Sequence, residues 1–471
     1  MGDETQNDVS NGANADHNQS RRDVIRVGLG AAAFAALPLP LRRTVRSTRS
    51  AEPDLRYPNA ALGAARWLRA TAITSPEGTT WAAVPPDPKT VQRDLYSGSP
   101  GVVLFLIELH RATGDRAWLD LATAGADYLA ATLPDAATGD EGAGLYTGLA
   151  GVGYTLEQAA LASGQQRYRA AATKALGAVI AAAHDVGDGV EWNDSTDIIS
   201  GTAGIGLYLM RGSTASGDPA ARRLSVRAGR RLLQREYRSG DASLWMMSPS
   251  FTRNMPNFSH GTAGVAYFLA TLAGETKDRA FADAAIRGGR YLQSVATPTD
   301  GGGMRIFHND PDGRDLFYLS WCHGPVGTAR LFHRLSTVTG DRAWFDYVPK
   351  LAQGVVGSGV PQRSAGFWNN ISQCCGNCGV SDFFATMYGL TSDASYLAFA
   401  RRVADDTLDR ATPEGDGLKW VQAENRVSPN VVLAQTGLMQ GAAGVGLAML
   451  RLDGALRGRR PTIALPDSPF T

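Results

Sequence analysis

Short, almost uninterrupted apolar stretches recur along the chain, and each follows a pair of glycines spaced as G-x-x-G. Examples are residues 102–107, 205–210 and 265–270. A helix that is apolar on nearly all sides must be covered by other elements. The pattern therefore predicts buried inner helices that begin at the glycine pairs.

Amphipathic segments lie between these stretches and open with Gly-Asp-Arg-Ala-Trp or a close variant, at residues 114–118, 278–281 and 340–344. Aspartate before a helical segment is a favourable N-cap. In the first of these segments apolar residues recur at spacings of three and four, as at Trp118 and Leu121, which is typical of an amphipathic helix. Each unit is thus predicted to hold an outer amphipathic helix, a turn, a glycine pair and an inner helix.

Seven such units follow one another, with their first glycines 50 to 65 residues apart. The pairs are Gly98/Gly101, Gly148/Gly151, Gly201/Gly204, Gly261/Gly264, Gly324/Gly327, Gly376/Gly379 and Gly441/Gly444. Repeats of this length stack into solenoids or rings. Inner helices that are apolar all round favour a closed double ring, an all-α, α/α toroid. The glycine loops would then open on one face near a central cavity, where glycine permits positive φ and close backbone approach.

Length and charge narrow the function classes. The 471 residues exceed the size at which single cores usually stop growing, and we expect residues 52–471 to form the one toroid rather than several domains. With 46 basic and 45 acidic residues, the chain is not a strongly electrostatic nucleic-acid binder. No apolar stretch of about 20 residues occurs after the N-terminal region, which excludes a polytopic membrane protein.

The first 51 residues are predicted to be disordered and to carry an export signal. Residues 1–19 are polar, and the pair Arg21-Arg22 precedes the weakly apolar residues 27–41. This arrangement is similar to a twin-arginine signal. No clean cleavage site follows, so an uncleaved membrane anchor is one alternative; a basic disordered arm on a cytoplasmic protein is another.

Reactive side chains stand beside the glycine pairs of four adjacent units. The fifth unit has Cys322, the sixth has Cys374 and Cys375, the fourth has His260 and the third has Asp197. The same positions in units one, two and seven offer no comparable group, only Ser97, Thr147 and Gln440. If equivalent positions converge on the centre of a ring, three thiols, an imidazole and a carboxylate meet there.

Three thiolates and one open position suit a catalytic zinc ion. Two disulfides, for example Cys375 to Cys378, are the alternative, although adjacent Cys374 and Cys375 make a poor disulfide framework. The residues alone leave both readings open. Cys378 is interpreted as a small buried filler. Asp197 is alternatively a helix cap, and Asp194 and Glu191 compete for its role.

These residues together resemble the lanthionine synthetase C-like family, which includes the lanthipeptide cyclases. The resemblance rests on Trp-Cys-His-Gly at 321–324, Cys-Cys-Gly-x-x-Gly at 374–379, His-Gly-x-x-Gly at 260–264 and Asp-Ile-Ile-x-Gly at 197–201, and it covers roughly residues 57–455. It implies a toroid of seven inner and seven outer helices with one central zinc. Cys322, Cys374 and Cys375 would be the ligands, with Cys375 where many members have histidine.

The resemblance also implies a reaction, the addition of a peptide cysteine thiol to dehydroalanine or dehydrobutyrine to close a thioether ring. His260 would protonate the enolate, and Asp197 would accept the thiol proton or hold a neighbouring group; His323 would assist or only pack. The peptide would arrive already dehydrated by a separate dehydratase. One departure concerns an arginine of some bacterial cyclases, since Tyr318 occupies its position and Arg314 lies further back.

Two other functions stay open at this stage. The first is a non-cyclising member that keeps zinc and binds thiols or peptides, or adds a small thiol to an electrophile. The second is a toroidal glycosidase, which needs two opposed carboxylates in its cavity. The carboxylates near the relevant face, Asp197, Asp194 and Glu191, all lie on one unit, so the glycosidase is disfavoured.

Overall fold

The structure is a computed structural model and describes residues 54–139, 142–362, 370–424 and 428–470. The predicted disordered N-terminus and export signal, residues 1–51, lie outside this part of the chain and stay predictions. Within the described residues no helix has both the length and the apolar character of a membrane span.

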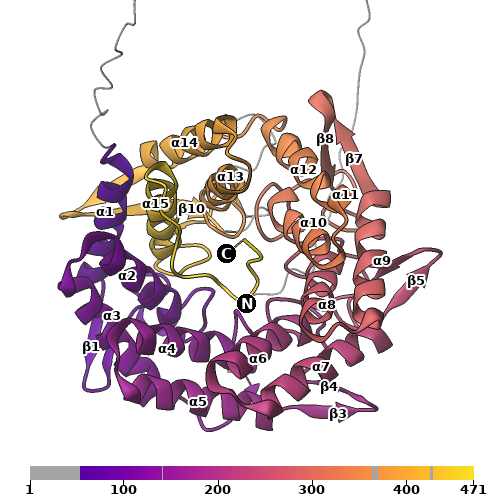
Figure 1. Cartoon of the computed structure of the whole chain (residues 1–471). Helices are drawn as coiled ribbons and strands as arrows, with labels where there is room; N and C mark the ends of the chain where they lie inside the picture. The colour runs from indigo at the N-terminus through magenta and orange to yellow at the C-terminus, as the bar shows by residue number, and fades with distance from the viewer. Residues whose placement is uncertain (1–53, 140–141, 363–369, 425–427, 471) are drawn as a thin grey trace, which may run out of the picture. The chain divides into compact units, whose positions relative to one another are not determined.

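Two concentric layers of helices make up the described residues (Figure 1). The inner layer consists of α2 (Ser99–Thr113), α4 (Leu149–Ser163), α6 (Thr202–Ser216), α8 (Thr262–Thr276), α10 (Pro325–Thr339), α13 (Asn377–Thr391) and α15 (Ala442–Leu456). Each inner helix packs against the next, and α15 packs against α2, which closes the ring. The predicted α/α toroid is confirmed.

An outer helix covers each inner one. The outer layer consists of α1 (Arg56–Ala70), α3 (Arg116–Ala131), α5 (Gln166–Ala181), α7 (Pro219–Gln234), α9 (Arg279–Val295), α11 (Arg342–Phe345) with α12 (Tyr347–Val356), and α14 (Ala394–Asp409). The side chains of Asp115, Asp278 and Asp341 each accept a hydrogen bond from the backbone two residues on. The N-caps predicted at these positions are confirmed.

Small antiparallel sheets follow five of the outer helices. They are β1 (Ile73–Ser75) with β2 (Gly78–Thr80), β3 (His184–Val186) with β4 (Gly189–Glu191), β5 (Tyr237–Ser239) with β6 (Ala242–Leu244), β7 (Ala296–Thr299) with β8 (Gly303–Ile306), and β10 (Gly417–Ala423) between β9 (Ala411–Glu414) and β11 (Val432–Ala434). Short 3-10 helices span Pro88–Thr90 (η1) and Asp300–Gly302 (η3). These elements leave the two helical layers intact.

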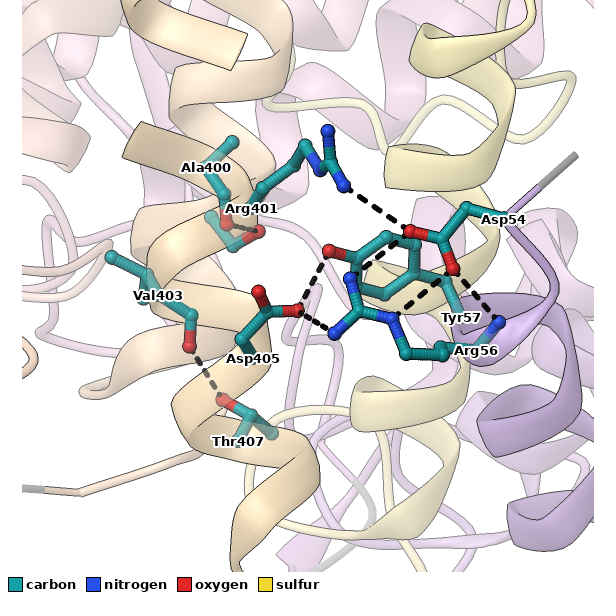
Figure 2. Close-up of polar contacts among 9 residues, drawn as sticks. Asp54, Arg56, Tyr57, Ala400, Arg401, Val403, Asp405 and Thr407 are labelled. Atoms are coloured by element: carbon teal, nitrogen blue, oxygen red, sulfur yellow. Dashed lines mark hydrogen bonds and ion pairs between the residues drawn. The ribbon is translucent and has the colours of Figure 1, made fainter. Parts of the chain in front are cut away.

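The first outer helix closes the ring by covering α15, the last inner helix. Tyr57 is fully buried and its hydroxyl donates to Asp405 of α14 (2.8 Å). Around it, Asp54, Arg56 and Arg401 form ion pairs of 3.0 to 3.3 Å (Figure 2). Because these charges are largely exposed, each pair contributes little, and closure rests on the buried apolar surface of α1.

The glycine pairs differ from the prediction in one respect. The first glycine of each pair is the helix N-cap with negative φ, for example −94° at Gly98 and −100° at Gly201. Positive φ is therefore the wrong reason for these glycines. Close approach is the right one: a Cβ at Gly327 would lie 1.9 Å from the carbonyl oxygen of Trp321, and one at Gly204 would lie 2.0 Å from that of Ile198.

The inner helices are also less uniformly apolar than predicted. Glu108 of α2, Arg330 of α10, Asp382 of α13 and Arg451 of α15 are buried or nearly so. Each finds a partner: Arg451 pairs with Asp382 at 2.6 Å, and Glu108 accepts backbone hydrogen bonds from the C-terminal segment. A buried charge needs such partners. The inner helices thus present a polar face as well as an apolar one.

Candidate metal centre

A closed cycle of backbone hydrogen bonds joins the seven loops that carry the glycine pairs. In each loop the residue two positions before the first glycine takes part, and the amide of one loop donates to the carbonyl of the next. The bonds run from Tyr96 to Tyr146 (2.9 Å), Tyr146 to Ile199 (2.8 Å), Ile198 to Ser259 (3.1 Å), Ser259 to Cys322 (2.9 Å), Cys322 to Cys374 (3.1 Å), Cys374 to Met439 (2.9 Å) and Met439 to Tyr96 (2.9 Å). Only the third loop deviates, because Ile198 donates while Ile199 accepts. The cycle holds the loops around one centre.

The three predicted metal ligands meet at this cycle. Cys375 Sγ lies 3.3 Å from Cys322 Sγ and 3.4 Å from Cys374 Sγ, and the three sulfur atoms lie within 4.8 Å of one another. Cys322 and Cys374 are each 3% exposed. All four cysteines are free thiols in the structure, and Cys378 is fully buried outside the cluster. Two adjacent loops thus bring three thiols to one point.

Hydrogen bonds favour ionisation within this cluster. Burial opposes loss of the Cys374 proton, but hydrogen bonds from Cys322, Cys375 and the Tyr96 hydroxyl outweigh it and hold the pKa of Cys374 well below its usual range. Burial, together with hydrogen bonds to the ionised Cys374, raises the pKa of Cys322. Within the cluster, these hydrogen bonds therefore favour ionisation of Cys374 over ionisation of Cys322.

Two further side chains reach the thiols from loops that the sequence analysis set aside. The Tyr96 hydroxyl of loop one donates to Cys374 Sγ (3.2 Å). Gln440 of loop seven donates from Nε2 to that hydroxyl (2.9 Å) and lies 3.8 Å from Cys375 Sγ. Units one and seven thus hold no thiol, imidazole or carboxylate at these positions, but they do supply hydrogen-bond donors to the thiols. Because the ring closes, loops seven and one come next after loop six. Tyr96 and Gln440 could therefore have been found by comparing equivalent positions around a closed ring.

His260 and Asp197 form a pair on the neighbouring loops. His260 Nδ1 donates to Asp197 Oδ2 at 2.6 Å, with Asp197 1% exposed and His260 25% exposed. The other oxygen, Oδ1, accepts from the backbone amides of Ser200 (2.9 Å) and Gly201 (2.7 Å). Asp197 is thus both the loop cap and the partner of His260. With Nδ1 engaged, the Nε2 atom of His260 is the one left for chemistry.

Aromatic and imidazole rings continue from His260. The ring centroid of His323 lies 5.7 Å from that of His260, 4.3 Å from that of His308 and 5.5 Å from that of Tyr318. Burial lowers the pKa of His323 well below its usual range, and His308 and His260 lower it further. His323 is therefore neutral near pH 7 and packs among the rings of His260, His308 and Tyr318.

The remaining sequence candidates are engaged elsewhere. Glu191 pairs with Arg231 of α7 (2.7 Å), and the Asp194 side chain is exposed. Arg314 pairs with Asp310 (2.7 Å) on an exposed turn. These contacts tie Glu191 and Arg314 to their own surroundings.

Residues 89–459 match the family model described as "Lanthionine synthetase C-like protein". The chain belongs to the lanthionine synthetase C-like family. This confirms the family suggested by the sequence motifs. No curated protein matches the chain in sequence.

Solved structures agree on the fold of this lanthionine synthetase C-like protein. Nisin cyclase is 16% identical, with a TM-score of 0.57 over 85% of this chain and 98% of that one. An α-1,6-mannanase of Salegentibacter sp. HEL1_6 is 13% identical, with a TM-score of 0.43 over 85% and 99%. An unsaturated glucuronyl hydrolase specific for heparin is 12% identical, with a TM-score of 0.46 over 87% and 99%. At 16% identity the likeness to nisin cyclase concerns the fold alone, and the two hydrolases, with TM-scores below 0.5, carry no argument.

The thiol cluster fits the zinc ion that the family implies. A tetrahedral zinc with Zn–S bonds of about 2.3 Å places sulfurs about 3.8 Å apart. The sulfur separations of 3.3 and 3.4 Å are slightly shorter than that value, and all three atoms lie within 4.8 Å of one another. Cys322 and Cys374 are buried, Cys375 is partly buried, and all three are hydrogen-bonded, as ligands held by outer partners are. Three protein ligands leave one position open on a tetrahedral ion.

Proposed function

We propose that this protein is a zinc-dependent cyclase that adds a peptide cysteine thiol to dehydroalanine or dehydrobutyrine and forms a lanthionine-type thioether. The observation that carries the proposal is that the His260–Asp197 pair and the three clustered thiols lie on consecutive loops of one hydrogen-bond cycle. Cys322, Cys374 and Cys375 would hold the ion. Zinc bound there supplies a Lewis acid that keeps a substrate thiol deprotonated near neutral pH.

His260 would handle the proton. The reaction makes one S–C bond at the β-carbon of the dehydro residue and one C–H bond at its α-carbon, and it breaks the S–H bond and the C=C π bond. The thiol proton passes to Nε2 of His260 and is then delivered to the α-carbon of the enolate. No electron is gained or lost overall. A positioned imidazole suits both transfers, since one ring nitrogen can accept a proton and later donate it.

Asp197 would orient His260 rather than accept the thiol proton itself. Its Oδ2 atom holds Nδ1 of His260, and its Oδ1 atom is occupied by the amides of Ser200 and Gly201. A buried carboxylate in this position fixes the tautomer and stabilises the imidazolium when it forms. Of the two roles that the family resemblance implied for Asp197, the contacts favour the holding role.

A second function within the family is supported by one observation. The position of the arginine found in some bacterial cyclases holds Tyr318, whose ring lies 5.5 Å from that of His323. A tyrosine can donate a hydrogen bond to an enolate but brings no positive charge. A member that binds thiols or peptides without cyclising, or that adds a small thiol to an electrophile, is therefore the alternative.

The partners and the location are also proposals. The substrate would be a peptide dehydrated beforehand by a separate dehydratase. The twin-arginine-like segment supports export of the folded protein, and the cytoplasm is the alternative. The two locations can be separated by fusing the full chain to a reporter that supports growth only after export. Growth is then compared between cells with Arg21 and Arg22 intact and cells with both changed to Lys.

The decisive experiment combines metal analysis with turnover. Purified protein is expected to contain about one zinc per chain and to cyclise a dehydrated, cysteine-containing peptide, detected by loss of the free thiol at unchanged mass. His260→Ala should keep the zinc and lose cyclisation. Metal-free protein with a Cys375–Cys378 disulfide would contradict the proposal. Addition of a simple thiol to a small electrophile without any peptide cyclisation would favour the alternative.

A further inference from the structure

The segment that follows α15 enters the ring instead of leaving it. Because α15 begins at the loop carrying its glycine pair, its C-terminal end lies away from that face, and the segment returns from there into the middle of the ring (Figure 1). Ile463 is 1% exposed and Asp467 is fully buried. These residues are therefore part of the ring's interior.

Five inner helices hold this segment. Glu108 of α2 accepts from the amide of Ile463 (3.1 Å), and Arg451 of α15 donates to its carbonyl (3.1 Å). Tyr154 of α4 donates to the carbonyl of Ala464 (2.7 Å). Arg330 of α10 donates to the carbonyl of Asp467 (2.9 Å). The ring of Phe470 lies 5.0 Å from that of His333 of α10 and 6.4 Å from that of Phe383 of α13. The segment has one defined course.

Its buried carboxylate reaches the loop of the first predicted zinc ligand. Asp467 Oδ2 accepts from the indole Nε1 of Trp321 at 2.9 Å and lies 3.4 Å from Arg330 Nη1. The Trp321 ring is 3% exposed and packs against Tyr146 (5.0 Å) and Phe258 (5.8 Å) of two other loops. The next residue is Cys322. A side chain held on three sides fixes the backbone from which that thiol projects.

We infer that Asp467 is a positioning residue for the metal centre, which it serves by holding Trp321 and, through it, the Cys322 thiol. The inference rests on the proposed zinc site and adds a group outside the three ligands and the His260–Asp197 pair. Outer partners of metal ligands typically change metal affinity 10- to 100-fold when they are removed. Asp467 contacts Trp321, the neighbour of Cys322 in sequence, and not the ligand itself. We therefore expect its removal to weaken zinc binding by the lower end of that range, about 10-fold.

The test compares zinc affinity in four proteins, measured by competition with a chromophoric chelator, with the absorption spectrum of the cobalt-substituted form as second readout. The variants are Asp467→Ala, Trp321→Phe and the double variant. Trp321→Phe leaves the Asp467–Arg330 pair intact and removes the indole N–H together with the five-membered ring, so it reports even where Asp467→Ala does not fold. Each single change is expected to weaken zinc binding about 10-fold and to shift the thiolate-to-cobalt band. The double variant should be no worse than either single variant, since both remove one link.

Tyr154→Phe is the matched control, because it removes another buried hydrogen bond to the same segment, at Ala464, and leaves the contact between Asp467 and Trp321 in place. It is expected to lower the thermal midpoint and leave zinc affinity and the cobalt spectrum unchanged. Equal weakening in Tyr154→Phe, additive losses in the double variant, or single variants with unchanged affinity and spectrum would overturn the inference. Failure of the proposed zinc site would look different, since the unchanged protein itself would then bind no zinc.

Discussion

Loops two and six of the ring follow the same backbone course. In each, the residue two positions before the first glycine joins the hydrogen-bond cycle, Tyr146 in loop two and Cys374 in loop six. In each, a Cβ on the first glycine would collide with a carbonyl, at 1.9 Å in Gly148 and 2.1 Å in Gly376. Yet loop two carries the pair Tyr146-Thr147, and loop six carries Cys374-Cys375.

The loops differ in the side chains at the two positions directly before the first glycine. The backbone at these positions maintains the ring, and the side chains determine the chemistry. The cycle needs only an amide and a carbonyl from each loop, which any residue except proline supplies in full. The side chains at these positions are therefore free to differ. Loops five and six use them for thiols, loop four for His260, and loops one and seven for donors to the thiols, whereas Asp197 of loop three lies four residues before its glycine, Gly201.

The largest expected effect is on zinc binding, and it distinguishes Cys374 from Cys378, two thiols of the sixth unit. Cys374→Ala should abolish stoichiometric zinc binding, since loss of a direct ligand exceeds the roughly 100-fold upper range for outer partners. Cys378→Ala, which removes a fully buried thiol outside the cluster, should retain the zinc and lose only thermal stability. Zinc content after dialysis, measured by atomic spectroscopy, decides it. Equal zinc loss in both variants would show that the cluster is not the metal site.

The next effect concerns loops three and four. His260→Asn should lower the rate of thioether formation by about 10²- to 10⁴-fold, the usual contribution of a positioned acid–base group. Zinc content should not change, because the imidazole contacts Asp197 rather than a thiol in the structure. Single-turnover assays on a dehydrated peptide, with zinc measured on the same samples, give both values. Retained turnover would remove His260 from the mechanism.

A smaller effect distinguishes Tyr96 from Tyr146, which occupy equivalent positions in loops one and two. Tyr96→Phe removes the hydroxyl that donates to Cys374 and should weaken zinc binding about 10-fold, as loss of an outer partner does. The hydroxyl of Tyr146 makes no hydrogen bond to a thiol among the described residues. Tyr146→Phe is accordingly expected to leave zinc affinity unchanged in the chelator competition. The same affinity in both variants would mean that the Tyr96 contact has no energetic weight.

The smallest effect is a pH dependence of the folding stability, which arises from His333 of the inner helix α10. Burial, with Arg334 nearby, lowers the pKa of His333 to about 4, whereas the unfolded chain has about 6.5. Between these values the unfolded chain binds a proton that the folded ring excludes, so stability is full above pH 6.5 and falls as the pH drops towards 4. His333→Leu should remove about 1 kcal/mol of this loss, allowing for the partial exposure of the ring.

Thermal midpoints of the two proteins at pH 7.0 and pH 4.5 provide the comparison. Between pH 7.0 and pH 4.5 the midpoint of His333→Leu should fall by less than that of the unchanged protein, because only the unchanged protein takes up a proton at this position on unfolding. Parallel curves would show that His333 takes up its proton in the folded state as readily as in the unfolded one.

The sequence predicted the repeat, the ring and the thiol cluster because each follows from local spacing. Cys322 and Cys374 stand at one repeat position, and equal positions in a closed ring converge. Tyr96 and Gln440 were missed because their role depends on which loops become neighbours on closure, and side chains with ordinary chemistry give no local signal. Asp467 lies in a segment without repeat pattern, so its contact with Trp321 could not be predicted. The buried charges of the inner helices were missed for a related reason, since their partners come from other helices.

The cycle has a consequence for the order of assembly. Gln440 and Tyr96 are 344 residues apart in sequence and 2.9 Å apart in space, and the first outer helix covers the last inner one. A nascent chain that ends before the seventh loop can therefore form helical pairs but cannot close the cycle. Contacts of such long sequence separation form late and slowly. The hydrogen bonds from Tyr96 to Cys374 and from Gln440 to Cys375 thus form only after synthesis is nearly complete, which makes the finished metal centre a late product of folding.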